Sequence, residues 1–168
     1  MSDTNENLHR QIVYIAEMVE AATDGELYKV GGDYEIIPDI DEWKEKEYEK
    51  KVKEFKDSHG SYDSELYDSY EEYMEDEIGS ADDIDEPDSV SLYEYLEEKS
   101  LGDIRFEVDI QNEFCGAKML LAYGGPTIWL RDDRVFGYWW SDERSVPLNE
   151  NARAELWEYF RDIWKNIK

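Results

Sequence analysis

Between Asp57 and Glu98 the chain carries 17 Asp and Glu residues and no Lys or Arg. Like charges at this density repel one another, and the repulsion opposes a compact fold. A segment that tolerates such a field is suited to contact a surface of opposite charge. The commonest strongly basic protein surfaces are those that bind nucleic acid.

The charge divides the chain into two unequal parts. The formal charge is −26, of which residues 1–100 carry −23 and residues 101–168 carry −3. We therefore expect two domains: a mainly helical, strongly acidic module over 1–100, and a compact β-sheet plus C-terminal helix over 101–168. Aromatic residues make up 14% of the chain. Disordered acidic segments are poor in aromatic residues, so a folded protein is expected.

Charge, cysteine content and hydrophobicity indicate where in the cell the protein is expected to act. A chain of this charge repels phosphates, so direct binding to nucleic acid is not expected. Cys115 is the only cysteine, and a chain without an internal disulfide fits a reducing cytoplasm. No apolar run approaches the length of a membrane span, and the acidic start Met1–Glu6 is unlike a signal peptide. We expect a cytoplasmic protein.

Apolar residues at steps of three and four predict four helices in the first hundred residues: 4–22, 41–56, 62–78 and 90–99. Two β-prone runs around Gly31-Gly32 predict a hairpin over 26–37. In the third helix an apolar stripe that includes Tyr70 and Tyr73 is expected to face inward. Acidic side chains cover the rest of that helix.

The remainder of the chain reads as strands followed by a helix. Strict alternation over 104–111, two β-prone runs at 117–123 and 127–131, and a further run at 134–140 predict an antiparallel sheet. An amphipathic helix is expected over 149–167. The predicted fold class is α+β: a helical acidic N-terminal part followed by a small antiparallel sheet of three to four strands closed by a C-terminal helix.

The acidic segment supplies the candidate binding residues. Its carboxylates would take the place of phosphates and pair with Lys or Arg of a partner, and exposed tyrosines among them could stack on Arg. The alternative is a solvated face with no specific partner. The expected partner-binding residues are Asp63, Glu65, Asp68, Glu71, Glu72, Glu75, Asp76, Glu77, Asp82, Asp83, Asp85, Glu86, Asp88, Tyr62 and Tyr67.

Catalytic chemistry finds little support in the sequence. The acidic loop 82–88 lacks the ligand spacing of a calcium loop, so no metal site is expected. His9, His59 and Cys115 stand without partners at a telling spacing, and no phosphate-binding or nucleophile motif is present. We therefore expect neither an enzyme nor a cofactor.

Two aromatic and glycine-rich motifs distinguish the second half. Gly124-Gly125-Pro126 indicates a bend, and Gly137-Tyr138-Trp139-Trp140 indicates either packing of a twisted sheet or an aromatic anchor at an interface. If Trp139 and Trp140 are strand neighbours, one of them must face away from the other. The outward ring would be covered by the N-terminal module, by a second copy in a homodimer, or by a partner.

The segment Leu121-Ala122-Tyr123-Gly124-Gly125-Pro126-Thr127-Ile128-Trp129-Leu130, with Gly137 to Asp142, resembles a motif in small acidic proteins of bacterial phages and mobile elements. Such proteins are often similar to antirestriction proteins or anti-CRISPR inhibitors, many of which mimic nucleic acid. The resemblance implies an inhibitor of a host-defence nuclease, a Cas9-type effector or a restriction enzyme, acting in the bacterial host cell. The alternatives are an acidic interaction or chaperone module for another basic protein, and a carboxylate–metal enzyme that acts on the defence system.

Overall fold

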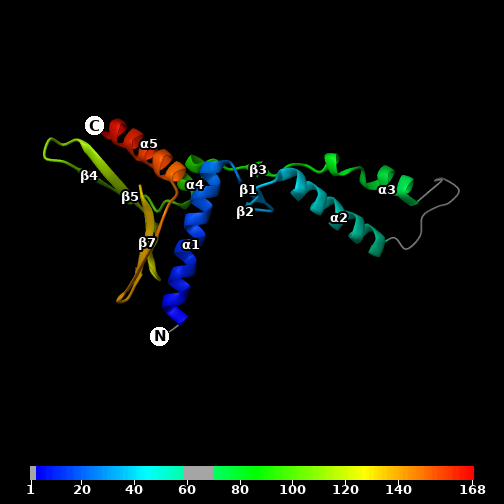
Figure 1. The fold of residues 1–168 in the computed structure, drawn as a ribbon, viewed down its shortest axis with the longest axis horizontal. Helices are drawn as coiled ribbons and strands as arrows, with labels where there is room; N and C mark the ends of the chain where they lie inside the picture. Colours follow the sequence, from blue (N-terminus) through cyan, green and yellow to red (C-terminus); the bar gives the residue numbers. More distant parts are fainter. Residues whose placement is uncertain (1–2, 59–69) are drawn as a thin grey trace. The chain divides into compact units, whose positions relative to one another are not determined.

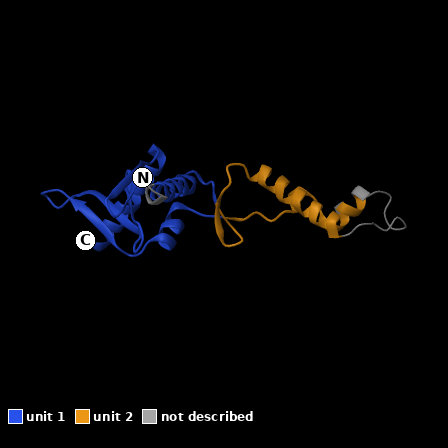
Figure 2. Ribbon diagram, turned by 90° about the horizontal axis from the view of Figure 1, so that it is seen from below, with its two compact units in different colours: residues 1–27, 89–168 blue, residues 28–88 orange. Residues whose placement is uncertain are grey.

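The computed structural model describes residues 3–58 and 70–168. The α+β class is confirmed: helices accompany a three-stranded sheet and a five-stranded antiparallel sheet (Figure 1). The chain forms two compact units (Figure 2). Unit 1 comprises Met1–Leu27 and Ser89–Lys168, and unit 2 comprises Tyr28–Asp88.

The sheet of unit 1 is a meander in which each strand pairs with the next. Its strands are β4 (Ile104–Val108), β5 (Phe114–Ala122), β6 (Thr127–Arg131), β7 (Arg134–Trp139) and β8 (Asp142–Pro147). It thus has one strand more than the three to four expected. The additional strand, β8, was not predicted because its sequence is polar and has no apolar alternation. It is an edge strand, mostly exposed, and it is held by its hydrogen-bonded pairing with β7.

Two long helices pack against this sheet, on the same side in Figure 1. Helix α1 (Asp3–Asp24) contacts β7, β8 and α5 (Glu150–Ile167), and α5 contacts β5. Both helices bury one apolar face against the inward residues of the strands. The side chains of these helices and strands that have no exposure are Leu8, Ile12, Val19, Ala117, Met119, Leu130, Val135, Ala152, Leu156 and Phe160.

The unit boundaries differ from the division at residue 100 that the charge suggested. Helix α1 belongs to the core of the sheet unit, and α4 (Leu92–Lys99) packs on α1. Tyr93 of α4 meets Tyr159 of α5 edge to face, with ring centroids 5.0 Å apart. The charge boundary reflects residues exposed to solvent, whereas a compact unit is defined by its apolar contacts. The charge boundary and the unit boundary therefore need not fall at the same residue.

The face of the sheet that points away from α1 and α5 carries Trp129. Successive strand residues point to opposite faces, so Trp129 lies opposite the helix-packed Ile128 and Leu130. Its ring is only 3% exposed, because the Arg105 guanidinium lies 4.7 Å and the Lys118 ammonium 4.9 Å from the ring centroid. Trp129 Nε1 donates a hydrogen bond of 2.9 Å to the Tyr138 hydroxyl.

Unit 2 contains the predicted hairpin and two helices. Strands β1 (Leu27–Val30) and β2 (Asp33–Ile36) flank Gly31-Gly32, and the short β3 (Asp88–Ser89) completes a sheet of order β2-β1-β3. Helix α2 (Ile40–Ser58) is followed by α3 (Tyr70–Ile78) and the 3₁₀ turn η1 (Ala81–Asp83). Positions 62–69 of the predicted acidic helix lie outside the described residues.

The described helices of unit 2 bury few of their apolar side chains. None of the α2 residues is buried, and its apolar residues Trp43, Val52 and Phe55 are half-buried. Tyr73 of α3 packs on Phe55, with ring centroids 5.4 Å apart. Unit 2 therefore buries much less apolar surface in its helices than unit 1 does.

None of the helices in residues 3–58 and 70–168 is long and apolar enough to cross a lipid bilayer.

Candidate functional site: the acidic segment of unit 2

The acidic segment keeps most of its described carboxylates in solvent. On α3 the exposed side chains are Glu72, Asp76 and Glu77, and after it they are Asp82, Asp83, Asp85, Glu86 and Asp88. Glu71 and Glu75 also belong to α3. The predicted binding residues Tyr62, Asp63, Glu65, Tyr67 and Asp68 lie outside the described residues. Unit 2 has 23 acidic and 7 basic residues, a formal charge of −16.

One of these carboxylates is held by a lysine from elsewhere in the sequence. Lys44 of α2 has its ammonium 2.7 Å from Glu86 Oε1, and the Lys44 side chain is only 16% exposed. The hydrogen bond to Glu86 raises the pKa of Lys44 above its ordinary value. The segment that contains no cation in sequence therefore has one beside it in space, contributed by α2.

Another carboxylate has a structural partner. Asp83 Oδ2 accepts hydrogen bonds of 2.8 Å from both the backbone N–H and the hydroxyl of Ser80. These bonds, the backbone one first, lower the pKa of Asp83. The carboxylate fixes the start of η1, so Asp83 and Glu86 are less available to a partner than the sequence suggested.

Six further carboxylates of the segment are exposed. We use "acidic surface" for Glu72, Asp76 and Glu77 on α3 together with Asp82, Asp85 and Asp88 in the segment after it. Glu72 and Asp76 lie one turn apart on α3, about 6 Å along the helix axis. That spacing is close to two phosphate steps of a DNA strand, each about 3.4 Å.

Among the described residues no group of three or more His, Cys, Asp or Glu side chains is arranged to hold a metal ion. What the acidic surface can offer is an electrostatic contact with a cationic partner.

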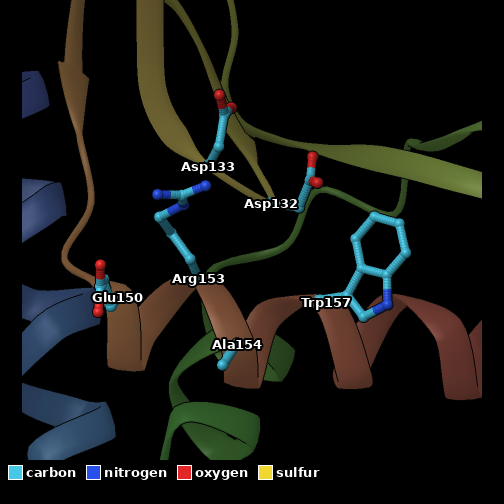
Figure 3. A pocket seen from close by; sticks show the side chains of 6 residues that line it. All are labelled: Asp132, Asp133, Glu150, Arg153, Ala154 and Trp157. Atoms are coloured by element: carbon cyan, nitrogen blue, oxygen red, sulfur yellow. The ribbon is translucent and has the colours of Figure 1, made fainter.

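A different depression lies in unit 1, between the β6–β7 turn and α5 (Figure 3). It has a volume of about 390 Å³ and is lined by Asp132, Asp133, Glu150, Arg153, Ala154 and Trp157. In Figure 3 the Arg153 side chain points from α5 toward Asp133, with Trp157 one turn further along the helix. No sequence pattern indicates this depression, because the turn and the helix meet only in the fold.

Two of the carboxylates of this depression, Asp132 and Asp133, lie near arginines and differ in how they are paired. Asp133 accepts from Arg134, whose Nε is 3.0 Å from both carboxylate oxygens. Asp132 Oδ1 is buried without a hydrogen-bond donor, although Arg131 Nε lies 3.4 Å away. Burial raises the pKa of Asp132.

Comparison of the chain with protein-family models, with curated proteins and with solved structures gave no match. A proposal for its function therefore depends on the charges and contacts described above.

Proposed function

We propose that this protein inhibits a host-defence nuclease, a Cas9-type effector or a restriction enzyme, by placing its acidic surface in the enzyme's basic groove for nucleic acid. The observation that supports the proposal is the exposure of the six carboxylates of the acidic surface, in a unit of charge −16. Surface charge of one sign opposes folding, and contact with a cationic groove would compensate that cost.

The mechanism is electrostatic. Lys and Arg that hold phosphates in the groove would hold carboxylates instead, and Arg can pair with a carboxylate through two parallel hydrogen bonds. Attraction over distance would make association fast and sensitive to salt. The protein would thus compete with DNA or RNA for the groove, and no chemical step is required of it.

A cleavage assay tests the proposal. The protein is titrated into a Cas9–guide RNA complex and, separately, into a type I restriction enzyme, each with its DNA substrate. We expect inhibition of one of them, with an inhibitory concentration that rises when more DNA is added. The triple variant Glu72→Lys, Asp76→Lys, Asp82→Lys should inhibit at least tenfold less well.

The matched control changes the same number of exposed carboxylates in unit 1: Glu17→Lys, Glu97→Lys, Glu158→Lys. It alters the net charge by the same amount and should inhibit like the wild type. Equal inhibition by the two triple variants would contradict a role for the acidic surface. Binding to the nuclease without competition from DNA would indicate an acidic interaction module instead.

A further inference from the structure

Three exposed aromatic side chains gather at one end of the five-stranded sheet. In a meander the β5–β6 and β7–β8 connections lie at the same end, and the register places Thr127 at the start of β6 opposite Tyr138 near the end of β7. Tyr123 is 78% exposed, Tyr138 41% and Trp140 91%. We call these three residues the aromatic edge.

The backbone at Trp140 is unusual for so large a residue. Trp139 pairs with Asp142, so Trp140 and Ser141 form a two-residue hairpin turn, and Trp140 has φ = +59°. Positive φ at the first turn residue is typical of a type II′ turn, in which glycine is preferred at this position. A tryptophan there is strained and, being exposed, gains no packing in return. Strain without a folding benefit indicates a role in binding.

The strands hold one member of the aromatic edge, Tyr138, in place. Tyr138 is fixed by the hydrogen bond from Trp129, whose ring is covered by Arg105 and Lys118. Gly137 lies against Leu8 of α1, so close that a Cβ at this position would be 3.2 Å from Leu8 Cδ1. Aromatic side chains held in position before binding lose little entropy on contact, as in the energetic centres of protein interfaces.

The charge of the protein indicates what kind of partner the aromatic edge can bind. Asp142 and Glu143 lie opposite Trp139 and Tyr138, and Arg144 follows one pair further away, opposite Gly137. With a formal charge of −26 the molecule repels nucleic acid, anionic bilayers and a second copy of itself. A protein surface with an apolar pocket surrounded by Lys and Arg is complementary both to the rings and to this charge.

We propose that the aromatic edge is a second docking surface, which inserts Trp140 into an apolar pocket rimmed by Lys and Arg on the protein that the acidic surface binds. That both surfaces bind the same partner rests on the proposed function. The acidic surface supplies salt-sensitive attraction, and the aromatic edge supplies an apolar anchor that salt does not weaken.

The first measurement is the thermal stability of Trp140→Gly. Glycine relieves the strain at positive φ, so the melting temperature should stay unchanged or rise by a few degrees. A fall of more than about 4 °C would show that the indole supports the fold, and would overturn the inference.

The second measurement uses random 12-residue peptides displayed on phage and selected on the full-length protein. We expect enriched peptides that combine Lys or Arg with Leu, Phe or Trp, bound at least tenfold more weakly by Trp140→Gly and by Tyr123→Ser. The matched control is Ile110→Gly, because Ile110 is 100% exposed in the β4–β5 connection at the other end of the sheet. This variant should bind the peptides like the wild type.

The two proposals fail in different ways. No enrichment, or enriched peptides that bind Trp140→Gly as well as the wild type, would overturn the aromatic edge and leave the nuclease assay unaffected. Peptides that depend on Trp140 and still bind the triple variant of the acidic surface would support the edge, even if neither nuclease is inhibited.

Discussion

Asp132 is a carboxylate whose surroundings disfavour its charge. Burial raises its pKa, and the nearby Arg131 offsets this only in part. A carboxyl group whose pKa is higher in the folded than in the unfolded state, where it is about 3.9, favours folding only when protonated. Its ionised form therefore subtracts from stability once the pH rises through the folded pKa.

We predict that Asp132→Asn is more stable than the wild type at pH 7, and that this advantage shrinks or disappears at pH 3.5, where both states of the wild type are largely protonated. Urea unfolding at the two pH values measures the difference. A variant that is less stable at pH 7 would show instead that the attraction of Arg131 outweighs the cost of burial.

At the scale of elements, the close approach of α1 to the sheet requires a glycine at position 137. A Cβ at Gly137 of β7 would lie 2.9 Å from the Thr127 carbonyl oxygen and 3.2 Å from Leu8 Cδ1 of α1. We predict that Gly137→Ala lowers the free energy of unfolding by about 1–3 kcal/mol, because the backbone of β6 cannot give way cheaply.

Gly125→Ala is the matched control for this prediction, since a Cβ there meets no atom within 4 Å. It should leave stability nearly unchanged or raise it slightly by restricting the unfolded chain. Chemical denaturation of both variants measures the difference. Equal stability of the two would mean that the β6 backbone and α1 both shift to accommodate the methyl group.

Periodicity predicted the elements whose apolar faces are covered, and it was least informative where they are not. Helices α1 and α5 match the predicted 4–22 and 149–167 within about two residues, because each buries one continuous face. The predicted last strand ends at Trp139, since Trp140 turns the chain. For α2 the apolar stripe was found, but a periodic pattern says which side is apolar and not how fully it is covered.

For the candidate site, sequence indicated the charge but not its pairing. The exposure of Glu72, Asp76 and Glu77 on α3 is what a helix this rich in carboxylates is expected to show. The Lys44–Glu86 pair and the aromatic edge arise from residues far apart in the chain, which meet only through topology. The motif Gly137 to Trp140 indicated a possible aromatic anchor, but neither the turn at Trp140 nor the Lys44–Glu86 pair could be predicted from the sequence.

At the scale of the whole molecule, repulsion among like charges should limit stability. Raising the salt concentration from 0.01 to 0.1 M shortens the screening length from about 30 to about 10 Å and weakens this repulsion. It also weakens ion pairs such as Lys44–Glu86, but the excess of 16 negative charges in unit 2 outweighs them. We therefore predict that the melting temperature rises with salt over this range.

The triple variant Glu72→Lys, Asp76→Lys, Asp82→Lys supplies the comparison, because it lowers the net charge from −26 to −20. Its melting temperature in 0.01 M salt should equal or exceed that of the wild type, and its increase with salt should be smaller. Calorimetry at several salt concentrations measures both quantities. A melting temperature that falls with salt would show that ion pairs, rather than repulsion, dominate the electrostatic energy. In that case, contact with a basic groove would relieve no strain in the free protein, and the attraction proposed here would have to arise from the partner alone.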